Sequence, residues 1–351
     1  MKVLTASQAI SPAIDRTKRI LFQPFLWRDY LKLAAVACIA EGFTGNFNLN
    51  FPQHHSSSPS VDAGTIFHLP GEVIALIALA VMAALAIGIV ICYLVTRLRF
   101  AFFHCLVSQT REIVPGWRLY REQAWRFFKF SLLLGLAMLC IVLAVLIPFG
   151  FMLFDLFRAV PAGGHPDWPS LFGLLLLFIP VVLLLGFVLW TVKVVVEDFM
   201  LPHVALDNAS IAEAWNAALS RVEAEKGKFF VYLLLRLVLP LLAMMALFLV
   251  LAIPLVIVFG ILALAAGGFN WMLADATGWF AVVRIAGEVF FGVTAIGIGL
   301  LVGFSLGGPI ATWIRNFALV FYGGRYKALG DLLYPPPAPP SPLWSGPPTV
   351  A

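Results

Sequence analysis

The chain has 351 residues, of which 62% are hydrophobic and 12% are charged, and its mean hydropathy is +0.97. Soluble domains are about 45–50% apolar and about 25% charged, so this composition excludes a water-soluble enzyme, a disordered regulator and a secreted disulfide scaffold. In so apolar a chain, the net charge of +5 indicates contact with anionic lipid rather than nucleic-acid binding. We therefore expect an all-α integral membrane protein that contacts membrane lipids and binds no nucleic acid.

Six apolar stretches are candidates for membrane-spanning helices, each of which needs about 20 residues. They cover residues 31–47, 72–95, 130–156, 171–192, 229–268 and 285–309. The first is the weakest, because it is short and carries Glu41. The fifth is too long for one straight span and contains Pro240 and Pro254, so it is expected either to kink or to divide into two helices.

The basic residues give an independent test of this count. All but three of the 23 lysine and arginine residues (the exceptions are Arg158, Arg236 and Arg284) fall on the same side of a six-span arrangement. The positive-inside rule then places both termini and the longer connectors in the cytoplasm. We predict a six-helix transmembrane bundle in the inner (cytoplasmic) membrane, a multi-pass protein with both ends inside.

The chain divides into an N-terminal amphipathic segment (1–30), a membrane domain (31–334) and a proline-rich tail (335–351) that is expected to be disordered. Within the membrane domain each pair of spans follows an aromatic-rich cytoplasmic segment and ends in an aromatic-rich amphipathic stretch. Those closing stretches are residues 99–107, 197–206 and 315–324. The pattern indicates either three copies of one helix-hairpin unit or the general likeness of helical hairpins.

The cytoplasmic connectors carry their own signals. Ser210 and Glu213 fit a capping box, and the apolar residues that follow predict an amphipathic helix over 210–222. This helix is expected to lie at the bilayer surface or to pack under the bundle. The connector over 96–129 is basic and the next one is acid-rich, so the two connectors either dock on each other or contact lipid headgroups separately.

Two ionisable residues lie inside predicted spans, Glu41 in the first and Arg236 in the fifth. Ionisable groups in the bilayer are energetically costly and usually face the interior of a bundle or a water path. Their depths allow an intramembrane polar pair. In the alternative, Glu41 marks the outer end of a short span and Arg236 extends towards the cytoplasm.

Small residues recur every four positions in the sixth span, at Ala295, Gly299, Gly303 and Gly307. Such a ridge permits close helix packing in lipid, so we expect a neighbouring helix to approach it closely. The same region, GFSLG at 303–307, resembles the nucleophile segment of intramembrane serine proteases. All six histidines fall outside the predicted spans, so Ser305 has no evident base, and packing is the favoured interpretation.

No catalytic, cofactor-binding or metal-binding residues are predicted. Histidines and aspartates in the outer loops could bind zinc in principle, but their spacing matches no zinc motif. These residues are His54, His55, Asp62, His68, His165 and Asp167. The four cysteines lie in apolar stretches without a CxxC pair and are expected to be buried small side chains.

Three phrases resemble an uncharacterised bacterial family of six-span membrane proteins: AIDRTKRILFQPFLWRDYLKLAAVA, EDFMLPHVALDNASIAEAW and GKFFVYLLLRLVL. That family is similar to the membrane domain attached to some glycerophosphodiester phosphodiesterases. A catalytic barrel needs about 250 further residues, and no region of this chain has the composition of one. The resemblance thus implies a membrane body without phosphodiesterase activity and supplies no catalytic residues.

The functional hypothesis from sequence is a non-enzymatic scaffold or lipid-handling accessory. Scarce intramembrane charge and a basic inner face fit lipid contact better than the transport of polar solutes. A small transporter or channel is the main alternative, and an intramembrane enzyme is the third. A membrane-protein partner is compatible with the first hypothesis, and the oligomeric state stays open.

Overall fold

The computed structural model of the protein describes residues 3–42, 71–158, 168–274 and 277–334. Within these ranges the regular structure is helical and contains no strand, so the predicted all-α class is confirmed. In chain order the elements are α1 (Ile10–Phe22), α2 (Trp27–Ala37), the π-helical turn η1 (Cys38–Gly42), α4 (Gly71–Ser108), α5 (Ile113–Leu119), α6 (Arg121–Arg158), α7 (Trp168–Val194), the π-helical turn η2 (Val195–Met200), α8 (Leu201–Leu206), α9 (Ile211–Ala224), α10 (Lys226–Met272), α11 (Trp279–Gly323) and α12 (Lys327–Leu333).

Five stretches of the described chain are long and apolar enough to cross a membrane, and they contain 37 to 47 residues each. At about 1.5 Å per residue these helices are roughly 55–70 Å long, whereas the hydrocarbon core of a bilayer is about 30 Å thick. None of the residues in the most apolar window of each is buried within the protein. Each long helix therefore has one part that is apolar enough to face lipid, and another part that extends beyond the hydrocarbon core.

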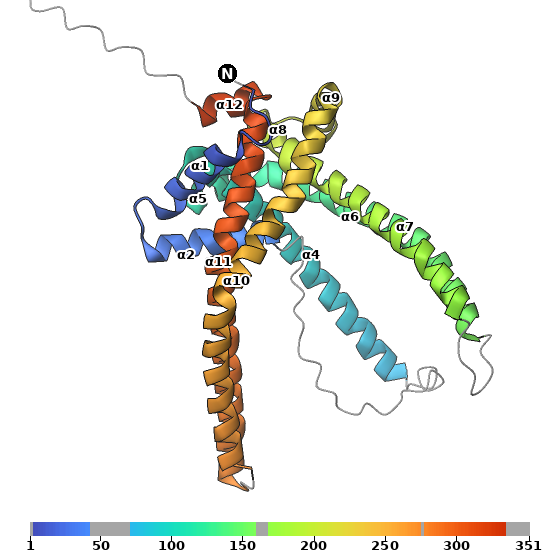
Figure 1. Cartoon of the computed structure of the whole chain (residues 1–351), viewed down its shortest axis with the longest axis vertical. Helices are drawn as coiled ribbons and strands as arrows, with labels where there is room; N and C mark the ends of the chain where they lie inside the picture. The colour runs from blue at the N-terminus through green and yellow to red at the C-terminus, as the bar shows by residue number, and fades with distance from the viewer. Residues whose placement is uncertain (1–2, 43–70, 159–167, 275–276, 335–351) are drawn as a thin grey trace, which may run out of the picture.

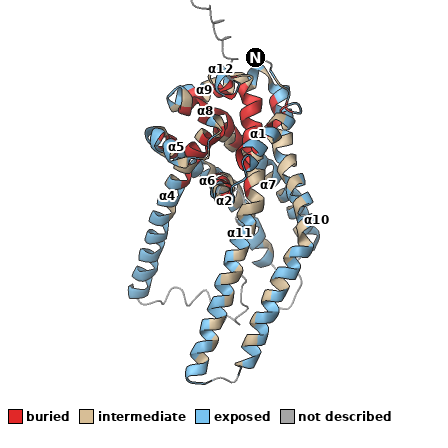
Figure 2. Ribbon diagram, turned by 90° about the vertical axis from the view of Figure 1, so that its left-hand side faces the viewer, coloured by how far each residue is buried: buried red, intermediate tan, exposed pale blue. Residues whose placement is uncertain are grey.

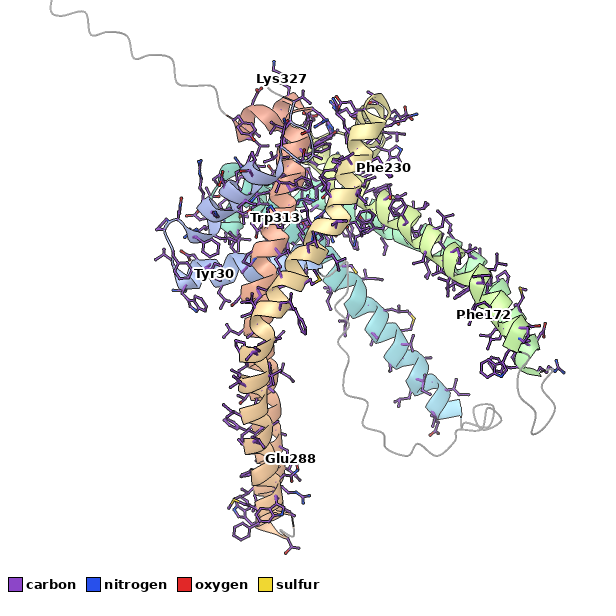
Figure 3. All side chains as sticks on the ribbon, viewed as in Figure 1. Tyr30, Phe172, Phe230, Glu288, Trp313 and Lys327 are labelled. Atoms are coloured by element: carbon purple, nitrogen blue, oxygen red, sulfur yellow. The ribbon has the colours of Figure 1, made fainter. Side chains whose placement is uncertain are left out.

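The long helices converge at one end and diverge at the other (Figure 1). They form three legs, which are α4, the α6–α7 hairpin and the α10–α11 hairpin. Ring contacts hold each hairpin together towards its far end: Phe149 lies 5.0 Å from Phe178 between ring centroids, and Phe269 lies 5.9 Å from Phe291. Other side chains project outward along the legs, as Phe172 does (Figure 3).

The end where the legs converge, which we call the head, holds the buried core (Figure 2). Its centre is the last part of α11, where every residue from Ile314 to Gly323 is buried. Tyr232 of α10 stacks on Phe321 at 4.5 Å and on Phe317 at 5.1 Å. The stretches 99–107, 197–206 and 315–324, which the sequence suggested are amphipathic, are mostly buried and form this core.

The first of the six predicted spans does not form a long helix within the described residues. Its residues up to Gly42 belong to α2 and η1, and residues 43–47 lie outside the described ranges. α2 lies across α11 at the level of the head (Figure 1), with Leu33 and Ala37 buried. A count of six spans is therefore not confirmed, because the described part of this segment packs on α11.

The fifth predicted span is a single helix. α10 continues through Pro240 and Pro254, which decides between the two alternatives left by the sequence. Proline has no backbone N–H and displaces the preceding turn, so it bends a helix. In Figure 1 the part of α10 in the head is accordingly inclined to the part in its leg.

The amphipathic helix predicted over 210–222 is confirmed as α9, and it begins with the capping box. The Ser210 backbone N–H donates to Glu213 Oε2 at 2.9 Å, and the Glu213 N–H donates to Ser210 Oγ at 3.3 Å. Hydrogen bonding of the Ser210 backbone N–H to the carboxylate lowers the pKa of Glu213. Ala214 and Ala218 are buried and pack against the core of the head, so α9 belongs to the head.

The small-residue ridge of α11 makes close contact only at its end nearest the head. A Cβ added at Gly299 or Gly303 would meet no atom within 4 Å, whereas one at Gly307 would lie 2.9 Å from Cys38 Sγ. The closest approach is at the next residue, Gly308, where a Cβ would lie 2.5 Å from Ala34 Cα. The neighbour is α2, so the expected close packing lies further along the helix than the spacing suggested.

A labelling experiment tests which side of the membrane each end of the described chain occupies. Ser11 lies in the head and Glu72 at the far end of α4, so we expect cysteines at these two positions to react with a membrane-impermeant maleimide from opposite sides. The measurement is labelling of sealed vesicles of both orientations. Cys92 and Cys140 are replaced by serine in the background, because these two cysteines are exposed and not buried as the sequence suggested, whereas Cys38 and Cys105 are buried. Reaction of both positions from the same side would show that the head and the far end of α4 do not lie on opposite sides of the membrane.

Gly308 and Gly303 provide a matched pair for the packing of α2 on α11. Gly308→Leu should destabilise the head, because overpacking typically costs about 1–3 kcal/mol and here the obstacle is backbone. Gly303→Leu adds the same side chain to open space and should leave the melting temperature in detergent near that of the parent. Equal melting temperatures for the two variants would contradict this packing.

Candidate functional site: a buried charge network and two apolar chambers

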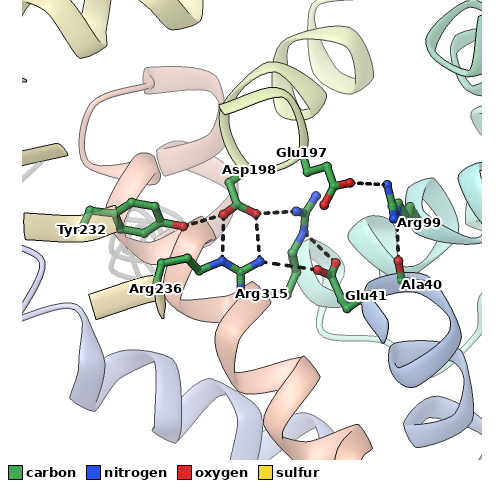
Figure 4. A network of polar contacts seen from close by, with 8 residues as sticks. All are labelled: Ala40, Glu41, Arg99, Glu197, Asp198, Tyr232, Arg236 and Arg315. Carbon is green, nitrogen blue, oxygen red and sulfur yellow. Dashed lines mark hydrogen bonds and ion pairs between the residues drawn. The ribbon is translucent and has the colours of Figure 1, made fainter. Parts of the chain in front are cut away.

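Asp198 of η2 lies at the centre of a polar network in the head (Figure 4). Its carboxylate accepts hydrogen bonds from the Tyr232 hydroxyl at 2.7 Å, from Arg315 Nη1 at 2.8 Å and from Arg236 Nε at 3.1 Å. The Asp198 side chain is completely buried. Hydrogen bonds between charged groups are the strong class, and here they join η2 to α10 and α11.

Glu41 of η1 is the second acidic partner of both arginines. Its two carboxylate oxygens lie 3.6 Å from Arg236 Nη2 and 3.6 Å from Arg315 Nε. These separations are those of ion pairs rather than of well-formed hydrogen bonds. Each arginine is thus shared between Glu41 and Asp198, so η1 is tied to the same centre.

Arg99 of α4 extends the network on the other side. Its Nη1 donates to Glu197 Oε1 at 2.8 Å, and its Nε donates to the Ala40 carbonyl oxygen at 2.7 Å (Figure 4). The basic connector and the acid-rich connector therefore dock on each other, one of the two arrangements that the sequence left open. A contact between Arg126 and Asn208 joins the same two connectors.

The two π-helical turns place all three acidic side chains of the network. η1 carries Glu41, and η2 carries the neighbours Glu197 and Asp198. A π turn inserts one extra residue into the helix, and such turns are frequent at functional sites. In η2, Glu197 contacts α4 while Asp198 contacts α10 and α11.

Together with Lys193, which interacts electrostatically with Glu197 and Glu41, the site carries one unit of positive charge in excess. The cationic side chains are Arg99, Lys193, Arg236 and Arg315, and the acidic ones are Glu41, Glu197 and Asp198. This formal charge of +1 attracts an anion to the network.

The larger of two chambers beside the network has a volume of about 870 Å³. It lies between η1, α7, α10 and α11, and most of its lining is apolar. Its charged lining residues are Glu41, Lys193, Glu197 and Arg236. Gly299, Gly303 and Gly307 of the small-residue ridge line it as well, which explains the open space at the first two.

The smaller chamber has a volume of about 540 Å³ and lies between α4, α6 and the end of α7. It too is mainly apolar, and its charged lining residues are Arg99, Lys193 and Glu197. Lys193, Glu197 and Met138 line both chambers. The two chambers therefore meet at one charged position.

A second polar cluster lies further into the head. The Tyr322 hydroxyl and Arg221 Nη1 lie 2.8 Å and 3.3 Å from His203 Nε2, while Asp207 Oδ2 lies 3.2 Å from His203 Nδ1. Burial raises the pKa of Tyr326, whose ring centroid lies 4.1 Å from that of His203, so its phenol stays neutral. This cluster lines neither chamber and ties α8 and α9 to α11.

The structure brings together Glu41 and Arg236, which the sequence singled out as a candidate pair. It adds Tyr232, from the fifth predicted span, and four partners from outside the predicted spans: Arg99, Glu197, Asp198 and Arg315. A signal for three of them was present. Arg99, Asp198 and Arg315 each stand in an apolar, aromatic-rich stretch, where an ionisable side chain needs a buried partner.

The other candidate chemistry finds little support in the described residues. Ser305 Oγ is buried and has no hydrogen-bond partner there, although the Ser305 carbonyl accepts a hydrogen bond from Tyr30 at 2.6 Å. A serine nucleophile needs a base in contact. The histidines His54, His55, His68 and His165 considered for zinc lie outside the described residues.

Asp198→Asn tests the importance of the network for folding. The substitution leaves Arg236 and Arg315 with one acidic partner between them, and breaking a buried ion pair typically costs about 3–5 kcal/mol. We expect a large drop in the melting temperature in detergent. Glu288→Gln is the control, since its pair with Arg284 is longer, at 3.8 Å, and its side chain is 49% exposed. An Asp198→Asn protein as stable as the control would contradict a structural role for the network.

Comparison with known proteins gives a family but no activity. No curated protein and no solved structure matches the chain. The model of a family of unknown function, DUF7544, matches residues 4–332, a range that includes the whole charge network and both chambers. The expectation of membership in an uncharacterised family is confirmed, and the chain belongs to the DUF7544 family.

Proposed function

We propose that this DUF7544 protein is a non-enzymatic membrane protein that binds lipid, as a lipid-handling accessory or as a scaffold. Five long apolar helices support residence in a membrane. The concentration of lysine and arginine on one side supports an orientation with the head in the cytoplasm and a location in the inner membrane. Both termini then lie on the cytoplasmic side.

The observation that carries the proposal is the larger chamber. Its volume of about 870 Å³ lies in the range of about 300–1,000 Å³ that is usual for ligand sites. An apolar lining with charged side chains gathered in one part matches an amphiphile, which has an apolar chain and a polar head. A polar solute would instead need polar groups distributed around it.

The depth of the charged residues agrees with a lipid ligand. From Trp168 to Lys193 the chain rises roughly 37 Å along α7 at about 1.5 Å per residue. With Trp168 at one membrane interface, as tryptophan prefers, Lys193 lies near the headgroups of the opposite leaflet. A lipid in that leaflet has its polar group at this level and its acyl chains between the legs.

The resemblance of three phrases to the membrane domain attached to some glycerophosphodiester phosphodiesterases implies a membrane body without catalytic activity, which fits this proposal. The scaffold alternative adds a membrane-protein partner on the exposed apolar legs. In either form the protein needs no catalytic group of its own.

A small transporter or channel is the alternative. The observation in its favour is the convergence of ionisable groups, Glu41, Lys193 and Arg236, on one chamber. Substrate-dependent flux in proteoliposomes that is abolished by Glu41→Gln would favour this alternative. Flux equal to that of empty liposomes supports lipid binding without transport. An intramembrane enzyme ranks third, because Ser305 lacks a base among the described residues.

Filling the chamber tests lipid binding directly. Gly303→Trp places a large ring in the larger chamber, and Gly292→Trp places the same ring on an exposed part of α11. We expect Gly303→Trp to lose most of the lipid that co-purifies with the protein in mild detergent, and Gly292→Trp to retain it. The measurement is phospholipid phosphorus per mole of protein. Equal lipid content in the two variants and the parent would refute binding in this chamber.

A further inference from the structure

We infer that the two chambers hold one two-chain anionic phospholipid, with its phosphate near Lys193 and one acyl chain in each chamber. This inference rests on the proposed lipid binding and deepens it, because it names the class of headgroup and the number of chains. It depends on three features of the described residues: the shared wall of the chambers, the charge excess and the depth.

The residues that line both chambers, which we call the shared wall, determine how a ligand can be distributed between the two. Lys193 and Glu197 line both chambers, so a headgroup beside them has direct access to an apolar space on either side. The two apolar spaces have volumes of about 870 Å³ and about 540 Å³. A ligand with two apolar chains and one polar group matches this division, whereas a single-chain amphiphile leaves one chamber unused.

The charge excess determines the headgroup. The network and Lys193 carry four cationic and three acidic side chains, so a monoanionic phosphate brings the site to neutrality. A zwitterionic headgroup leaves the excess unchanged. Basic sites between transmembrane helices on the cytoplasmic side bind anionic headgroups for the same reason.

The first experiment measures headgroup preference. The full-length protein is reconstituted with equal amounts of dioleoyl phosphatidylglycerol and dioleoyl phosphatidylcholine, extracted in mild detergent, and its retained lipids are counted by native mass spectrometry. We expect the parent to retain one phosphatidylglycerol in preference to phosphatidylcholine. Lys193→Gln should lower this preference about fivefold, the effect of one basic residue beside anionic lipid. Lys129→Gln, an equal loss of charge on an exposed residue outside both chambers, should not.

A second variant moves the preference in the opposite direction. Glu197→Gln removes an acidic side chain from the shared wall, so it should increase the preference for phosphatidylglycerol. Damage to the fold would lower retention of both lipids and would not raise this ratio. An unchanged ratio in both Lys193→Gln and Glu197→Gln overturns the headgroup assignment.

The third variant tests the two chains. Gly135 lines only the smaller chamber, and a Cβ there would meet no atom within 4 Å. Gly135→Trp should therefore lose the two-chain lipid and still retain single-chain lysophosphatidylglycerol. Retention of the two-chain lipid as in the parent would show that the smaller chamber does not hold a chain.

These outcomes distinguish lipid binding itself from the assignment of its headgroup and chains. A parent protein that retains lipid without a headgroup preference contradicts this inference and leaves lipid binding intact. A parent protein that retains no lipid at all contradicts both. Retention of free glycerol phosphate in place of lipid would show that the network binds phosphate without using the chambers.

Discussion

The rest of the structure depends on the burial of the Asp198 carboxylate between Arg236 and Arg315. Three long segments far apart in the sequence must converge to satisfy these charges, because removing one partner leaves a buried charge uncompensated. Lipid supplies no hydrophobic force between apolar helices, so the legs themselves contribute little to this convergence. The polar centre therefore specifies which helix ends meet, and the aromatic core of the head packs around it.

The same constraint produces the chambers. The helices are held at their head ends and diverge towards the far ends, so apolar space remains beside the network and is bordered by charge where the helices meet (Figures 1 and 4). The length of the helices, roughly twice the thickness of the hydrocarbon core, is what allows one part to form a head while the other faces lipid. The fold and the proposed lipid site thus both depend on the charge network, which lies at the boundary between the head and the legs.

Much of this could be predicted from the sequence where local signals were strong. Composition and apolar length predicted the helical class and the membrane-spanning stretches, and Ser210 with Glu213 predicted the start of α9. The residue types at 41 and 236 identified two members of the network, because an isolated charge in an apolar stretch requires a partner. The first predicted span is not confirmed, since apolar length alone does not distinguish a helix that crosses a bilayer from one that packs across α11, as α2 does.

The pairing of the other partners could not be predicted, for two physical reasons. A π turn has no clear sequence signature, so VVVEDFM did not indicate that Glu197 would contact α4 while Asp198 contacts α10 and α11. The partners of Asp198 are separated from it by 38 and 117 positions, and such pairing depends on how the helix ends converge. The four-residue spacing also suggested close helix contact at Gly299 and Gly303, but these two residues border a chamber. The close contact with α2 is at Gly308, nearer the head.

The most direct measurement is a structure determination by electron cryo-microscopy of the protein in nanodiscs that contain anionic phospholipid. The account predicts that the three legs stay apart near the head, with headgroup density beside Lys193 and a tubular density in each chamber. Legs that close against one another, with side chains filling the space beside Lys193 and Glu197, would contradict it.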